Sequence, residues 1–168
     1  IALSAGVRWG TSTLEGDWIT MEDVMTQCAT TYSETYVMEM TGADILNMLE
    51  GVADNLFDPD PYLQSGGDMV RVGGLDYTIE PGAELGHRIS DVRLDNGHIV
   101  EAGETYKVAG WATVNRTPEG RLMWDVVRDY ILASRGKDNV LKIEKINHPK
   151  VVGVKDNPGI SDYPGELA

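Results

Sequence analysis

The sequence predicts an α+β (mixed α/β) domain, in which helices pack on a mixed β-sheet. Three observations lead to this fold class. Three segments carry apolar residues at the spacing of an amphipathic helix. The segments between them are short, partly alternating and rich in β-branched and aromatic residues, as strands are. The chain also has 19 glycines in 168 residues, which predicts many turns.

Residues 1–5 are predicted to form a short buried strand, followed by a glycine-rich turn. Thr20 opens the first helix, because Thr20 and Asp23 have the spacing of a capping box, with Asp in place of the usual Glu or Gln. We expect this helix to end before Thr30. Its apolar face is expected to consist of Val24, Met25 and Cys28.

Residues 32–40 are predicted to form the second strand, since aromatic and β-branched residues partly alternate there with polar ones. A second helix starts after Thr41, which has Asp44 three residues later as a capping partner. The Asp-Pro-Asp-Pro run at residues 58–61 ends this helix, which should lie flat against a sheet. Its apolar face is expected to consist of Ile45, Leu46, Leu49, Val52, Ala53 and Leu56.

The middle of the chain is predicted to be a meander of strands. The QSGGD loop at residues 64–68 leads into a strand at residues 69–72. Gly73-Gly74 is expected to form a hairpin turn into a strand at residues 75–80.

A second hairpin is predicted at Asn96-Gly97, which is among the strongest two-residue turn signals. It would join strands at residues 88–94 and 98–101. Another strand is expected at residues 106–113.

The last amphipathic helix is predicted at residues 122–133, and a weaker pattern predicts a short strand at residues 140–146. The apolar face of the helix is expected to consist of Leu122, Val126, Val127, Tyr130 and Ile131. We therefore predict one domain at residues 1–146 and a Pro/Gly-rich C-terminal tail at residues 147–168.

The charge of the chain argues against several classes of partner. There are 14 basic and 27 acidic residues, and the formal net charge of −13 disfavours binding to nucleic acid or to a membrane surface. No apolar run approaches the roughly 20 residues of a membrane span. The first residues already have the pattern of a strand, so we expect the chain to be a piece of a longer protein.

An arginine between glycines is the best candidate for a binding site. In Gly6-Val7-Arg8-Trp9-Gly10 the planar guanidinium of Arg8 could pair with two oxygens of an anion, while the glycines allow close approach of the backbone. The alternative is a structural arginine packed on Trp9.

Three further residues are candidates. Asp68 and Arg71 either form an ion pair at the edge of a hairpin or shape the mouth of the same site. Trp111 either belongs to the core or forms a wall of the binding pocket, since it precedes a polar loop.

Neither a metal site nor a catalytic nucleophile is expected within this chain. The histidines His87, His98 and His148 have no metal-ligand spacing. Cys28 lies on an apolar helix face, which is typical of a buried, unreactive thiol.

Several motifs over about residues 3–133 resemble the C-terminal domain of the 5'-nucleotidase family: GVRWG, TMEDV, MEMTGADILNMLEG, QSGG and ETYKVAGWATVN. The resemblance implies an N-terminal metallophosphatase domain, absent from this chain, that holds two metal ions. The isolated chain would then be inactive. Within the family, GVRWG, QSGGDMVRVGGLDY and GWA are most similar to the SoxB thiosulfohydrolases, the sulfur-oxidation branch.

Likeness to that branch implies a substrate and a place in the cell. The enzyme would be periplasmic, would use two manganese ions bound by the N-terminal domain, and would release sulfate from a cysteine S-thiosulfonate on a SoxYZ-like carrier protein. Arg8 would bind the sulfonate oxygens. The residues implied to line the substrate channel are Trp9, Asp68, Arg71 and Trp111.

Two alternatives stay open. One is the substrate domain of a 5'-nucleotidase or related phosphoesterase, although the loop at residues 115–120 lacks the aromatic residue that would stack on a base. The other is a non-catalytic module that binds an anion or a protein partner.

Overall fold

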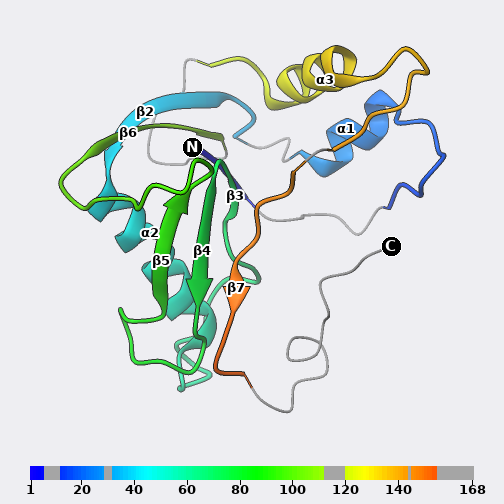
Figure 1. Ribbon diagram of the computed structural model, residues 1–168. Coiled ribbons are helices and arrows are strands. Elements are labelled where there is room, and N and C mark those ends of the chain that lie inside the picture. The colour runs from blue at the N-terminus through cyan, green and yellow to red at the C-terminus, as the bar shows by residue number, and fades with distance from the viewer. Residues whose placement is uncertain (6–11, 29–31, 112–119, 144, 155–168) are drawn as a thin grey trace.

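The computed structural model describes residues 1–168 except 6–11, 29–31, 112–119, 144 and 155–168. The described residues form three helices and seven strands, arranged as two mixed sheets with packed helices, which confirms the predicted fold class. Figure 1 shows helix α2 behind the β4–β5 pair, while α1 and α3 lie together at the opposite end of the molecule.

The first sheet has four strands in the order β2-β6-β1-β3. Strand β2 (Thr35–Thr41) is antiparallel to β6 (Thr105–Trp111), and β6 is parallel to β1 (Ala2–Ser4). Strand β3 (Arg71–Gly73) is antiparallel to β1 and forms the other edge. The N-terminal strand is therefore an inner strand of this sheet.

The second sheet has the order β5-β4-β7. Strand β4 (Leu75–Ile79) is antiparallel to β5 (Ile89–Leu94) and parallel to the short β7 (Lys150–Val151). Leu75, Tyr77 and Ile79 are buried on one face of β4 in strict alternation, as expected for a half-buried strand.

The hairpin predicted at Gly73-Gly74 is wrong. Strand β3 pairs with β1 in the first sheet, whereas β4 pairs with β5 in the second. Gly74 has a φ of 76°, a left-handed conformation that glycine adopts without steric cost, and it turns the chain from one sheet to the other. Two adjacent glycines predicted the turn, but the strand partners depend on contacts far away in the sequence.

The hairpin at Asn96-Gly97 is confirmed. The Leu94 amide donates to the His98 carbonyl at 2.8 Å, and the Gly97 amide donates back to the Leu94 carbonyl at 2.8 Å. The returning arm is shorter than predicted, with a single bridge between Arg93 and Ile99.

Helix α2 (Gly42–Phe57) packs against both sheets through β2 and β5. Its predicted capping box is present, since Thr41 accepts from the Asp44 amide and the Asp44 side chain accepts from the Thr41 amide. Ile45, Leu49 and Ala53, spaced four residues apart, have no exposed surface. The face is narrower than predicted, because Leu46 lies at its margin and is partly exposed.

Helices α1 (Met21–Gln27) and α3 (Met123–Ser134) build a second, smaller core. The capping box of Thr20 with Asp23 is confirmed. Two predicted face residues are instead exposed, Met25 in α1 and Tyr130 in α3. The members of the small core are Val24, Cys28 and Trp111, with Ala5, Met123, Trp124, Val127 and Ile131 packed against them.

The prediction of a strand at residues 140–146 is wrong for the residues that the structure describes there. Their one β-contact is an isolated bridge between Leu141 and Arg135. Side chains fix this segment instead. Lys145 Nζ donates to Asp95 at 2.7 Å, and this bond is the main reason that the pKa of Asp95 is lowered. The strand lies further on, at β7, within the predicted tail. The domain division at residue 147 stays a prediction.

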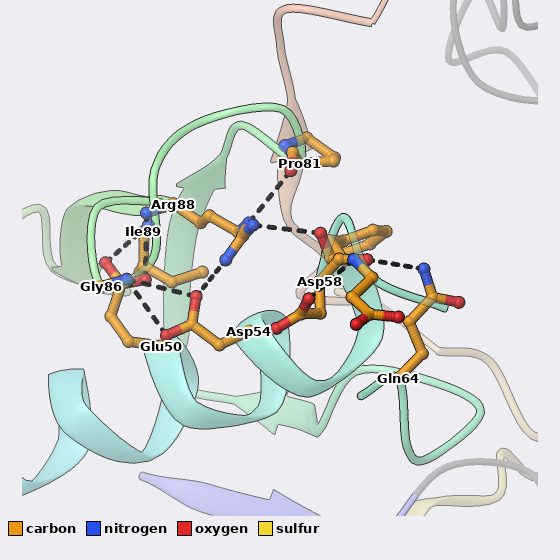
Figure 2. A network of polar contacts seen from close by, with 10 residues as sticks. Glu50, Asp54, Asp58, Gln64, Pro81, Gly86, Arg88 and Ile89 are labelled. Carbon is orange, nitrogen blue, oxygen red and sulfur yellow. Dashed lines mark hydrogen bonds and ion pairs between the residues drawn. The ribbon is translucent and has the colours of Figure 1, made fainter. Parts of the chain in front are cut away.

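A buried arginine ties the β4–β5 connection to the end of α2 (Figure 2). The Arg88 guanidinium pairs with Asp54 and donates to the Pro81 and Phe57 carbonyls, both at 3.0 Å. Glu50 accepts from the Arg88 amide at 3.0 Å and from the Ile89 amide at 2.8 Å. The buried charge therefore has a counterion and two carbonyl partners, as burial of an arginine requires.

Substituting Arg88→Met should destabilise the protein by about 3 kcal/mol, because the Asp54 carboxylate loses its counterion and two backbone carbonyls lose a donor in a largely buried place. Urea denaturation measures this free energy of unfolding. The control is Arg93→Met, which removes an exposed ion pair with Asp91 and should cost less than about 1 kcal/mol. Equal losses for the two variants would contradict the structural role of Arg88.

Candidate functional site

The candidate site lies at one edge of the four-stranded sheet. Strands β1 and β6 are parallel, so their last residues, Ser4 and Trp111, reach the same edge. Strands β2 and β3 run the opposite way, and their first residues, Thr35 and Arg71, pair with Trp111 and Ser4. We call this edge, marked by Thr35, Trp111, Ser4 and Arg71, the site edge.

Trp111 is anchored at the site edge by its indole. The indole Nε1 donates to Ser4 Oγ at 2.8 Å, and Ser4 Oγ donates to the Ala5 carbonyl at 3.0 Å. The side chain is buried against Val24 and Cys28 of the small core. Trp111 is therefore a core residue, and it also lines the cavity described next.

A cavity of about 290 Å³ lies between α1, α3 and the site edge. Its walls are mostly apolar, and Ser4, Asp23 and Gln27 are among the few polar residues that line it. The apolar lining comes chiefly from Ile19, Val24, Trp111, Met123, Val127 and Ile131. An apolar lining with a few polar groups is typical of a site that receives an apolar side chain or small ligand.

Asp68 and Arg71 form a loose pair on the surface. The distance from Arg71 Nη2 to Asp68 Oδ2 is 4.0 Å, and both side chains are exposed. Such a pair contributes little to stability, because solvent screens it. Arg71 therefore places a positive charge at the site edge that is free to interact with an anion.

Arg8 and Trp9 lie outside the described residues, as does the loop at residues 115–119. The described chain reaches the site edge at Ala5 and at Trp111, which are covalently joined to residues 6–11 and 112–119. Among the predicted site residues, the structure brings Arg71 and Trp111 to one edge, with Asp68 three residues before Arg71.

The described residues contain no group of three or more His, Cys, Asp or Glu side chains that could hold a metal ion. The single cysteine, Cys28, is buried, and burial raises the pKa of its thiol. A raised pKa reduces the thiolate fraction and hence the reactivity.

Two features of the site were not predicted from the sequence. Ser4 was assigned only to a strand, yet it orients the Trp111 indole from the neighbouring strand. Asp23 was predicted as a helix cap, and it both caps α1 and borders the cavity. No spacing signal links residues more than 100 positions apart, so only the fold reveals these contacts.

A comparison with protein families gives one decisive match. The model of the family described as "5'-nucleotidase, C-terminal domain" matches residues 1–123. The chain belongs to this family. Membership confirms the resemblance seen in the motifs, and the mixed sheets and three helices agree with the fold of solved relatives.

Solved structures place the domain within larger enzymes. The sulfate thiohydrolase SoxB of Thermus thermophilus, in complex with glycerol, is 30% identical with a TM-score of 0.78, covering 92% of this chain and 29% of that one. A 5'-nucleotidase precursor from Thermus thermophilus is 19% identical with a TM-score of 0.61, covering 82% and 28%. The NAD nucleotidase NadN of Haemophilus influenzae is 13% identical with a TM-score of 0.56, covering 79% and 26%.

The two nucleotidases, at these identities, share the fold alone. This chain spans less than a third of the length of each of the three proteins. No curated protein sequence matches it. Among the described residues, no helix is both long and apolar enough to cross a membrane.

Cys28 should react with a thiol reagent at pH 8 at least about 100-fold more slowly in the native protein than in the urea-unfolded protein, because it is buried and its pKa is raised. The chain has one cysteine, so the absorbance change on labelling reports this site alone. Rapid labelling of the native protein would mean that the small core opens readily.

Proposed function

We propose that this chain is the substrate-binding C-terminal domain of a two-domain dimetal hydrolase resembling SoxB. The enzyme would release sulfate from a cysteine S-thiosulfonate on a carrier protein. The observation that carries this proposal is the likeness to SoxB, which is 30% identical over 92% of the chain, against 19% over 82% for the 5'-nucleotidase precursor. The motifs GVRWG and QSGGDMVRVGGLDY support the same branch of the family.

The site edge supports anion binding. Arg71 stands there in a loose, exposed pair with Asp68, and Arg8 follows Ala5 by three residues in the sequence. In a chain with a net charge of −13, an anion needs such a local group of arginines. Trp9 and Trp111 would add apolar walls, and Asp68 would line the channel.

In the proposed reaction Arg8 binds two sulfonate oxygens with its planar fork and offsets the negative charge that builds up in the transition state. Trp9, Asp68, Arg71 and Trp111 orient the peptide arm that carries the substrate. The sulfur–sulfur bond to the sulfonate sulfur breaks while the oxygen of water joins that sulfur, which leaves as sulfate. The electron pair of the broken bond stays with the other sulfur, which remains on the carrier cysteine as a persulfide, and the two protons of water pass to the persulfide and to solvent. Two manganese ions bound in the N-terminal metallophosphatase domain would supply the activated water.

The partners follow from this assignment. The carrier would be a SoxYZ-like protein whose cysteine bears the substrate, and the enzyme would work in the periplasm. The isolated chain would be inactive, because the metal-bearing domain is not part of it.

A 5'-nucleotidase or related phosphoesterase is the second candidate, favoured by the family match over residues 1–123. The same arginines would then bind a phosphate. The sequence Asn-Arg-Thr-Pro-Glu-Gly at residues 115–120 offers no aromatic ring to stack on a base, which weakens this candidate.

The deciding experiment is product release by the manganese-loaded full-length protein. It is given a carrier peptide with a cysteine S-thiosulfonate and, in parallel, adenosine 5'-monophosphate. We expect sulfate release and no phosphate release. Phosphate release alone would assign the protein to the nucleotidases, and no release of either product would favour a non-catalytic binding module.

Arg8→Ala in the full-length enzyme should lower kcat/KM by about one to three orders of magnitude, because a charge-assisted contact to the transition state is lost. Steady-state kinetics of sulfate release measure the effect. Arg93→Ala serves as the control, since Arg93 is an exposed residue of the other sheet and should leave the rate unchanged. Wild-type kinetics for Arg8→Ala would remove the anion clamp from the mechanism.

A further inference from the structure

An exposed apolar surface lies on the segment that leads into α1. Leu14 is 72% exposed and Trp18 is 82% exposed, although both are large apolar side chains. The turn that presents them is ordered, since the Leu14 amide donates to the Asp17 carboxylate and the Asp17 amide donates to the Leu14 carbonyl, both at 3.1 Å. The exposed apolar residues of this docking surface are Leu14, Trp18, Ile19, Met21 and Met25.

The docking surface continues into the cavity. Ile19 belongs to both, because it is 46% exposed and also lines the cavity beside Trp111. Large exposed apolar patches on soluble proteins mark places where another surface binds. A cavity of about 290 Å³ is large enough to receive an apolar side chain from that surface.

The segment that carries the docking surface has charged side chains of one sign. Residues 12–28 contain four acidic side chains and no lysine or arginine. The acidic residues are Glu15, Asp17, Glu22 and Asp23. A binding surface of complementary charge would therefore carry lysine or arginine around an apolar centre.

The position of the docking surface indicates what covers it. A metal-bearing domain that acts on a substrate held at the site edge has to approach that edge closely. The cavity shares Ser4 and Trp111 with the site edge, so the docking surface stands directly beside the place where such a domain must come. More than two thirds of the SoxB chain lies outside the part that matches this domain, which leaves ample chain to form the cover.

We propose that the docking surface receives the metal-bearing domain of the same polypeptide. That domain would insert an apolar side chain into the cavity and place basic residues opposite Glu15, Asp17, Glu22 and Asp23. The proposal rests on the two-domain organisation in the proposed function, and it does not depend on the identity of the substrate. Docking of this kind would hold the metal ions at a fixed distance from the site edge.

Hydroxyl-radical footprinting of the full-length protein tests the proposal. For each side chain, protection is the oxidation rate in urea divided by the oxidation rate in the native protein. Mass spectrometry locates the oxidised residues. We expect Trp18 to be protected at least about tenfold, as at a covered interface. Tyr62 is 95% exposed on the loop after α2, and as the internal control it should show almost no protection. Protection of Trp18 as low as that of Tyr62 would overturn the proposal.

Matched variants test whether the docking surface itself is the contact. Trp18→Glu in the full-length protein should expose Met25 and raise its oxidation rate severalfold, because a charge now faces the apolar cover. Tyr62→Glu should leave the rate at Met25 unchanged. Equal rates at Met25 in both variants and the wild type would contradict the proposed contact.

The same footprinting experiment distinguishes the metal-bearing domain from two other partners that could cover the docking surface. Protection of Trp18 that disappears on dilution would assign the docking surface to a second copy of the protein. Protection that appears only when the substrate-bearing carrier is added would assign it to the carrier. Either outcome would overturn docking of the metal-bearing domain. No turnover is measured, so a failure of the proposed reaction would not affect the result.

Discussion

The parallel pairing of β1 with β6 is the contact on which the site depends. Ala2 and Leu3 lie beside Ala109 and Gly110, so two strands more than 100 residues apart end at the same place. Gly110 makes this close approach practicable, because a Cβ there would stand 3.1 Å from the Leu3 carbonyl oxygen and within 2.5 Å of the Tyr36 hydroxyl. The small core and the cavity are then built around Trp111 at that end. A larger residue at position 110 would disturb the sheet and the site together.

Helix α2 fixes the second sheet relative to the first. Its fully buried residues, Ile45, Leu49 and Ala53, share one core with Leu75 of β4 and Val108 of β6. Its start approaches the Glu101 backbone so closely that a Cβ at Gly42 would overlap the carbonyl oxygen. Its last turn is held by Arg88 (Figure 2). The helix is thus held at both ends, and strands of both sheets pack on it.

What could be predicted from the sequence was local. The capping boxes at Thr20 and Thr41 and the turn at Asn96-Gly97 each depend on residues within a few positions, and all three are confirmed. The hairpin at Gly73-Gly74 and the strand at residues 140–146 required knowledge of partners in distant parts of the chain. At the site, Arg71 and Trp111 come to one edge because of the order of the strands in the sheet. The hydrophobic periodicity of the sequence does not encode that order.

The two residues of β7 have a consequence for how this domain can be divided. Thr78 and Ile79 lie beside Lys150 and Val151, and the Val152 amide donates to the Ile79 carbonyl at 2.9 Å. A chain shortened to residue 146 would leave that side of β4 as a bare strand edge, open to pairing with another molecule. Truncation there is more apt to produce self-association than a simple loss of stability. Strand β7 thus covers an edge of β4 that would otherwise be open to pairing with another molecule.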